Sequence, residues 1–117
     1  MNSDIFKTAA ISQCFKSTYK KRLGAVVVNK NKIVGAGYNK VNSTGIPRVD
    51  GKHAEMEALN NTTAKYRQDS IIYVCRINKM DQLVLAKPCD ACQVVMRKLG
   101  VKYVWYSTET GWEKMVL

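Results

Sequence analysis

The stretch that decides the fold is residues 88–106, PCDACQVVMRKLGVKYVWY, which joins the signals of a helix to those of a strand directly after it. Pro88 is predicted at the first helical position, where its missing N–H costs nothing, and Asp90 follows in the first turn. Gly100 stands just past the helical pattern, as is typical of helix C-termini. Residues 101–106 are rich in β-branched and aromatic side chains, which favour a strand.

The same alternation of strands and helices continues on both sides of this stretch. Residues 70–78, SIIYVCRIN, predict a strand, and residues 53–61, HAEMEALNN, predict a helix. Residues 23–28 and 33–38 are two apolar runs around a short polar turn, which predicts a hairpin. Further predicted elements are a helix over 5–15, a short paired strand over 83–85 and a strand or helix over 111–117. This order indicates one layered α/β domain over residues 1–117.

The charge of the chain points to an anionic partner. Its 117 residues include 19 Lys and Arg but only 9 Asp and Glu, a formal net charge of +10. A nucleotide phosphate or a single-stranded nucleic acid fits this charge, and a solvated basic surface is the alternative. The sequence contains no membrane-spanning apolar run and no secretory pattern near Met1. We therefore expect a cytoplasmic protein without membrane contact, whose cysteines are reduced thiols or metal ligands.

A candidate metal site joins two distant segments. His53, the only histidine, begins one predicted helix, and Cys89 and Cys92 form a C-x-x-C pair at the start of the next. A helix N-terminus lowers the pKa of a thiol, which favours the thiolate that zinc binds. Three such ligands leave the fourth tetrahedral position for water, as in catalytic sites, so we expect one Zn²⁺ per chain. The alternative is a closed structural site completed by Cys14 or Cys75.

Glu55 distinguishes an enzyme from a structural metal site. Residues two positions apart on a helix do not share a face, so Glu55 need not bind a metal held by His53. It can instead stand beside the bound water as a proton carrier. The order H-x-E followed by P-C-x-x-C is the signature of zinc deaminases.

With these motifs, the chain resembles the cytidine/deoxycytidylate deaminase superfamily, including its opening hairpin over 23–28 and 33–39. The resemblance implies a three-layer α/β/α fold with a mixed sheet of four to five strands, and a homo-oligomer. It also implies that Glu55 is the catalytic proton shuttle and that Asn39 contacts the sugar or base of the substrate. The zinc ligands that it implies are His53, Cys89 and Cys92.

We expect other substrate contacts to lie next to these positions. Ala54, Lys87 and Pro88 directly adjoin the expected ligands. Tyr106 lies on the strand over 101–106, where alternate residues point to opposite faces, so it can reach the site. Packing in the core is the alternative for Tyr106.

Histidine as first ligand makes the chain more similar to the branch that acts on dCMP, free cytosine, tRNA adenosine or single-stranded polynucleotide. The predicted reaction is zinc-dependent hydrolytic deamination of cytosine to uracil in a free nucleotide or nucleoside, with dCMP first. The enzymatic alternatives are cytosine in single-stranded DNA or RNA and adenosine in tRNA. The non-enzymatic alternative is a zinc-stabilised nucleic-acid-binding module.

Overall fold

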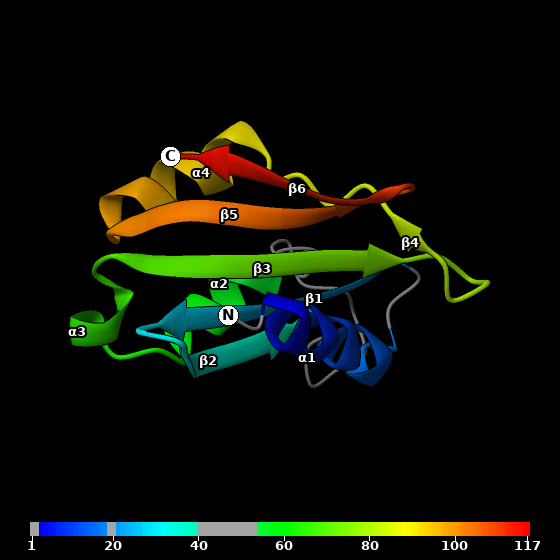
Figure 1. Ribbon diagram of the computed structural model, residues 1–117, viewed down its shortest axis with the longest axis horizontal. Coiled ribbons are helices and arrows are strands. Elements are labelled where there is room, and N and C mark those ends of the chain that lie inside the picture. The colour runs from blue at the N-terminus through cyan, green and yellow to red at the C-terminus, as the bar shows by residue number, and fades with distance from the viewer. Residues whose placement is uncertain (1–2, 19–20, 40–53) are drawn as a thin grey trace, which may run out of the picture.

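The computed structural model describes residues 3–18, 21–39 and 54–117 (Figure 1). Its centre is a six-stranded sheet in the order β2-β1-β3-β5-β6, with the short strand β4 paired to β3 off this path. The strands are β1 (Arg22–Asn29), β2 (Lys32–Tyr38), β3 (Ser70–Ile77), β4 (Leu83–Val84), β5 (Val101–Thr108) and β6 (Gly111–Val116). The helices are α1 (Ser3–Lys16), α2 (Ala54–Asn60), α3 (Ala64–Arg67) and α4 (Asp90–Lys98).

The sheet is mixed because one pair of neighbours is parallel. β3 and β5 run parallel, and α4 lies between them in the chain, as a crossover connection requires. All other pairs are antiparallel, including the hairpins β1–β2 and β5–β6. The expected α/β class and mixed sheet are confirmed. The sheet has six strands instead of four to five, because both β4 and the tail over 111–116 pair with their neighbours.

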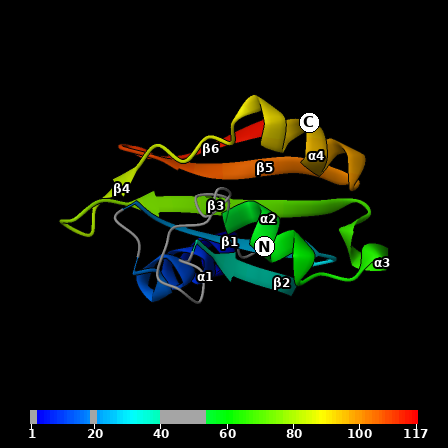
Figure 2. The ribbon, with the colours of Figure 1, turned by 180° about the vertical axis from the view of Figure 1, so that it is seen from behind.

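Helices cover both faces of the sheet. Figure 1 shows α1 in front of the sheet, and Figure 2 shows α2 and α4 on the opposite face. Alternate residues of each strand serve the two cores, since successive side chains of a strand point in opposite directions. In β1, Ala25 and Val27 join the core under α2 and α4, whereas Val26 and Val28 join the core under α1.

Two glycines let the helices approach the sheet closely. A Cβ atom on Gly24 would lie 2.4 Å from the backbone nitrogen of Cys14 in α1. On the other face, a Cβ atom on Gly37 would lie 2.6 Å from the backbone nitrogen of Ala58 in α2. Both contacts are with helix backbone, which cannot rotate away as a side chain can. Glycine at these positions therefore sets the height of each helix above the sheet.

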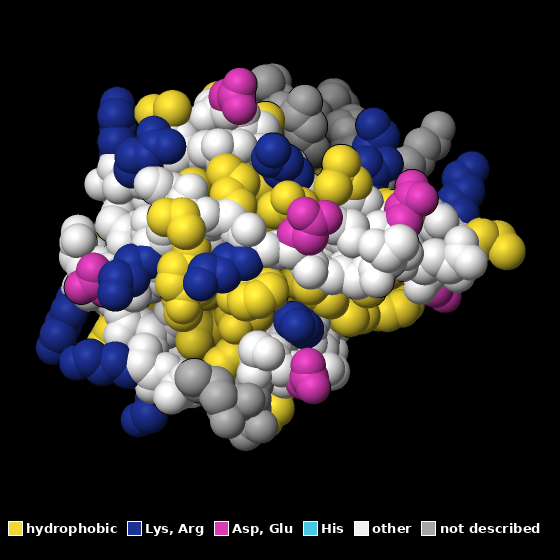
Figure 3. Space-filling model, turned by 45° about the horizontal axis from the view of Figure 1, so that its top comes forward, with side chains coloured by type: hydrophobic (Ala, Val, Ile, Leu, Met, Phe, Trp, Pro, Cys, Tyr) yellow, Lys and Arg dark blue, Asp and Glu magenta, His cyan; other side chains and the backbone are white. Residues whose placement is uncertain are grey.

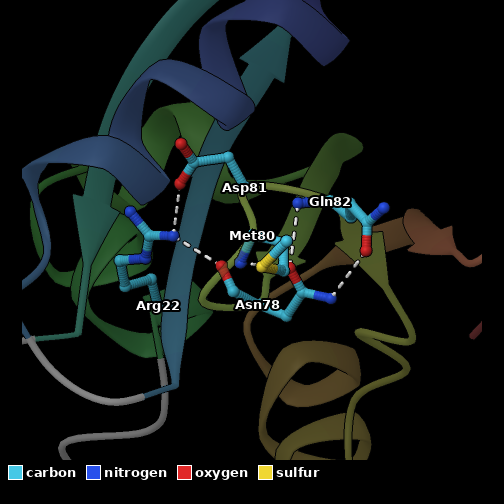
Figure 4. A network of polar contacts seen from close by, with 5 residues as sticks. All are labelled: Arg22, Asn78, Met80, Asp81 and Gln82. Carbon is cyan, nitrogen blue, oxygen red and sulfur yellow. Dashed lines mark hydrogen bonds and ion pairs between the residues drawn. The ribbon is translucent and has the colours of Figure 1, made fainter.

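The turn between β3 and β4 is tied to the start of β1 by a polar network (Figure 4). The Oδ1 atom of Asn78 accepts hydrogen bonds from the backbone N–H groups of Met80 and Gln82. The guanidinium group of Arg22 donates to the Asn78 carbonyl and forms an ion pair with Asp81. The network thus fixes the connection that leads from β3 toward α4.

Two details differ from the sequence-based expectation. Cys89 is the N-cap of α4 and has extended backbone angles, so Pro88 precedes the cap instead of occupying the first helical position. The short helix α3 lies in a segment that carried no predicted element. Within the described ranges, no helix combines the length and apolar character needed to cross a membrane.

Candidate active site

A pocket of about 210 Å³ opens where the first turn of α2 meets the segment that enters α4. Glu55 lies one residue inside α2, and Cys89 caps α4. The described residues that line the pocket are Lys21, Leu23, Glu55, Arg76, Leu85, Ala86, Lys87, Pro88 and Cys89. Segments more than 30 residues apart in the chain thus meet at the carboxyl end of β3, where α/β sheets commonly bind ligands.

The carboxyl group of Glu55 is the most unusual group in the pocket. The residue is only 3% exposed, and its Oε1 atom has no hydrogen-bond partner among the residues that the structure describes. Burial removes water from the charged form and raises the pKa of Glu55 to about 7, although a backbone hydrogen bond acts in the opposite direction. This carboxyl group can therefore both accept and donate a proton near neutral pH.

Two of the predicted zinc ligands are placed by α4. Cys89 is exposed at the helix N-cap and lines the pocket, and Cys92 is buried in the first turn beyond it. His53 lies outside the described residues, directly before α2. The residues that the structure does describe contain no group of three potential metal ligands. Two thiols at a helix N-terminus are donors of the kind that zinc binds, and Glu55 lies in the same pocket as Cys89, where it can act on a water and need not be a ligand.

The closed four-ligand alternative is wrong for the two remaining cysteines. Cys14 and Cys75 are both fully buried in the core under α1, and the Cys14 thiol donates a hydrogen bond to the Cys75 carbonyl oxygen. Cys92 belongs to the core on the opposite face of the sheet. A hydrogen bond with Cys14 and burial raise the pKa of the Cys75 thiol. Both residues therefore serve as small apolar packing groups.

Three cationic side chains share the pocket with Glu55. Lys87 was predicted from its place beside Pro88, and Lys21 belongs to a basic run in the sequence. Arg76 was not predicted; within the described ranges its Nε atom is buried without a hydrogen-bond partner. The signal was present in the sequence: Arg76 continues the positions of Ile72 and Val74, which face the core under α2 and α4. A charged residue on an apolar strand face indicates a site.

Asn39 lies beside the pocket, where its side chain forms hydrogen bonds with neighbouring residues of the protein. Its Oδ1 atom accepts hydrogen bonds from the Ser17 hydroxyl at 2.7 Å and from the Leu23 N–H at 2.9 Å. Its Nδ2 group donates to the carbonyl oxygen of Lys21. Because Lys21 and Leu23 line the pocket, Asn39 holds part of the pocket wall in place.

The other two predicted contacts lie in the core beneath the pocket. Ala54 is fully buried at the first position of α2, and Tyr106 is 8% exposed on β5. Both belong to the core under α2 and α4 and are absent from the described pocket lining. Pro88 and Lys87, in contrast, line the pocket, and their contact with a substrate stays a prediction.

Comparison with known proteins identifies the family. Residues 3–108 match the family model of the cytidine and deoxycytidylate deaminase zinc-binding region. This match covers most of the chain, so the chain belongs to that family. A zebrafish (Danio rerio) relative, tRNA-specific adenosine deaminase 2, is 32% identical over 93 residues. The match covers 72% of this chain but only 38% of the relative's length.

Solved structures with the same fold include two deaminases. The cytidine deaminase of Burkholderia pseudomallei superposes with a TM-score of 0.71 at 24% identity, covering 99% of this chain and 93% of that chain. The dCMP deaminase of cyanophage S-TIM5 superposes with a TM-score of 0.68, also at 24% identity, covering 88% and 79%. At this level of identity the two structures establish the fold.

Proposed function

We propose that this chain catalyses the zinc-dependent hydrolytic deamination of cytosine to uracil in a free nucleotide, with dCMP as the first candidate. The observation that carries the proposal is the buried carboxyl group of Glu55, whose Oε1 atom has no hydrogen-bond partner among the described residues, in the pocket that Cys89 also lines. A protein does not keep such a group for stability, because an unsatisfied buried polar atom costs free energy. Membership of the deaminase family supports the same reaction.

His53, Cys89 and Cys92 are the residues that would hold one zinc ion. When bound, zinc supplies the Lewis acidity that makes water a nucleophile near neutral pH. Glu55 accepts a proton from the attacking water at its carboxylate and delivers it to the ring nitrogen of cytosine. The carboxylate then takes the proton of the new C4 hydroxyl group and passes it to the amino group, so that the C4 carbonyl forms, the C4–N bond breaks and ammonia leaves. The overall change is cytosine and water to uracil and ammonia.

The cations in the pocket support a phosphorylated substrate over a free nucleoside. Lys21, Arg76 and Lys87 surround a single acidic group among the described lining residues, Glu55. A phosphate monoester would supply the missing negative charge, and the unpartnered Nε–H of Arg76 would supply a charge-assisted hydrogen bond. The related cyanophage dCMP deaminase has been solved with dCMP and dUMP.

The test measures ammonia release from dCMP, deoxycytidine, cytosine and a cytosine-containing oligonucleotide, with zinc content determined in parallel. Glu55→Gln keeps the size of the side chain and removes the proton carrier, so turnover should fall by about 10²–10⁴-fold while zinc remains bound. Glu57→Gln, two residues further along α2 and outside the described pocket lining, is the matched control. If Glu55→Gln retains full activity, the proposal is wrong.

A second candidate is the deamination of adenosine in tRNA. The 32% identity to a tRNA-specific adenosine deaminase favours it. Attack at C6 of adenine would use the same proton transfers at Glu55. An adenosine-containing tRNA stem-loop belongs in the same assay, and turnover of that substrate without turnover of dCMP would replace the first candidate by the second.

A further inference from the structure

The face of the sheet that carries α1 is only partly covered. α1 packs against β1, β2 and β3, and Figure 1 shows β5 and β6 extending beyond it. Three half-buried rings lie on this part of the sheet, together with two lysines. We call this surface the aromatic–lysine face. Its members are Lys7, Tyr103, Trp105, Trp112 and Lys114.

Both tryptophans of this face pack against the ring of Tyr73. Tyr73 is 4% exposed and lies beside Trp105 in the parallel pairing of β3 with β5. The rings of Tyr73 and Trp105 are nearly parallel, at 5° with centroids 6.3 Å apart. Trp112 meets Tyr73 edge-on at 6.4 Å. The tryptophan rings are therefore positioned by packing, which lowers the entropy that a partner must remove on binding.

Lysine ammonium groups stand over these rings. The Nζ atom of Lys7 lies 5.0 Å from the ring centroid of Trp105 and 6.0 Å from that of Trp112. The Nζ atom of Lys114 lies 4.3 Å from the centroid of Tyr103. Figure 3 shows Lys and Arg side chains interleaved with hydrophobic ones on this side of the molecule. The surface thus alternates flat apolar rings with positive charges.

We propose that the aromatic–lysine face binds single-stranded nucleic acid. Unpaired bases stack on aromatic rings, and the phosphates between them require cations at the spacing of the rings. A base on Trp105 would displace the ammonium group of Lys7, which is then free to contact the neighbouring phosphate. A duplex does not fit, because its base faces are already stacked on each other. The pocket opens on the other face of the sheet, so this site is separate from the proposed active site.

The positive charge of the aromatic–lysine face favours a nucleic acid over a second copy of the chain as its partner. Two copies meeting through this face would bring Lys7 and Lys114 of each copy together. Each copy also carries a formal net charge of +10, which adds to the repulsion between these lysines and opposes pairing through this face, while leaving other surfaces open to the expected homo-oligomer. A polyanion removes both costs, and the release of its counterions favours binding.

The tryptophans make the test specific. The chain has 2 tryptophans, Trp105 and Trp112, so intrinsic tryptophan emission reports only on this face. The probe is a fluorescein-labelled oligothymidylate of about 15 nucleotides, within the range of single-domain sites. It contains no cytosine, so the outcome does not depend on the proposed deamination. At low salt we expect saturable binding by anisotropy and, with unlabelled probe, quenching of tryptophan emission over the same concentration range.

Variants separate stacking from charge. Trp105→Leu should weaken binding about 5- to 150-fold, the range for the loss of one base–aromatic stack. The double variant Lys7→Gln/Lys114→Gln avoids large changes in packing and should reduce the log–log salt slope by about 1.4, or 0.7 per phosphate contact. Lys32→Gln/Lys98→Gln removes the same charge from exposed positions on β2 and α4 and is the matched control. The control should leave most of the slope intact.

Four results would overturn the proposal. One is the absence of binding at low salt. The second is binding that leaves tryptophan emission unchanged, and the third is binding that both double variants weaken to the same extent, because in either case the probe binds elsewhere. The fourth is self-association, seen by sedimentation at low protein concentration, that shields the tryptophans from acrylamide and that Trp112→Leu abolishes. In that case the partner of this face is a second copy of the chain.

Discussion

The two faces of the sheet are built from the same strands but differ in their buried polar atoms. On the face under α2 and α4, the pocket contains one carboxyl oxygen of Glu55 and the Nε atom of Arg76, both buried without a hydrogen-bond partner among the described residues. On the face under α1, the cysteines and aromatic rings pack against each other, and the open part presents rings with lysines above them. One face thus carries buried polar groups in a pocket, and the other carries packed side chains and half-buried aromatic rings.

Strand β3 shows how one element can serve both faces. Tyr73 and Cys75 point into the core under α1, whereas Val74 packs on the opposite face, where Arg76 lines the pocket. This division follows from the two-residue period of a strand. A change at one position should therefore affect one face and spare the other, which allows the comparison to be tested.

The largest effect is expected from replacing one cysteine on each face of the sheet by serine. Cys89→Ser should remove most of the zinc and lower turnover by more than about 100-fold, since even partners of ligands contribute 10–100-fold. Cys14→Ser, on the other face, should keep both zinc and turnover and lose only stability. Metal analysis measures the zinc content of each variant, and ammonia release measures its turnover. Zinc loss in Cys14→Ser, or full zinc in Cys89→Ser, would contradict the assignment of the two faces.

The second effect concerns the glycines under each helix. Gly24→Ala and Gly37→Ala both force a Cβ atom against helix backbone, so each should lower the free energy of unfolding by about 2–3 kcal/mol. Only Gly37→Ala displaces α2 and with it Glu55, so only this variant should lose turnover under conditions where it remains folded. Urea unfolding and kcat at low temperature are the measurements. Equal loss of turnover in both variants would mean that a displacement of α1 on one face also disturbs the active site on the other.

Part of the fold and of the candidate site can be predicted from the sequence, and part depends on contacts between distant segments. Apart from α3, the strands, the helices and the hairpin β1–β2 follow from local periodicity. Glu55, Pro88 and Cys89 belong to sequence motifs and Lys87 directly precedes one, whereas their meeting in one pocket is a result of the fold. Arg76 interrupts an apolar strand, which marks its position as unusual in the sequence, but only the fold shows that this face of β3 borders the pocket. Tyr106 could reach either core or pocket from its sequence position, and the packing of α4 decides for the core.

The aromatic–lysine face was beyond sequence analysis for a similar reason. Trp105 was identified as an aromatic strand residue, but its neighbours come from α1, β3 and β6. The parallel register of β3 with β5 places Tyr73 beside Trp105, and that register depends on the whole crossover through α4. Long-range register of this kind has no local signature in the chain.

The third prediction refines the pocket side of the comparison. Arg76→Gln removes one charge-assisted hydrogen bond to a phosphate and should raise KM for dCMP by about tenfold, with kcat and zinc content nearly unchanged. Turnover of deoxycytidine, which has no phosphate, should change little. Arg97→Gln, exposed in the last turn of α4, is the control. If Arg76→Gln lowers turnover of both substrates equally, Arg76 serves the reaction centre and not the phosphate.

The smallest effect is expected at the polar network beside the pocket wall. Asp81→Asn removes the ion pair with Arg22 and keeps a residue type that tolerates the positive φ of 63° at this position. The Asp81 side chain is 57% exposed, so solvent screening limits the loss of unfolding free energy to about 0.5 kcal/mol or less. The loss should shrink further at high salt, because a screened pair has less to contribute. Urea unfolding at low and high salt measures it. A loss above about 1 kcal/mol that salt does not reduce would mean that the network acts through the hydrogen bonds of Asn78, and that the turn between β3 and β4 stabilises the entrance to α4 directly.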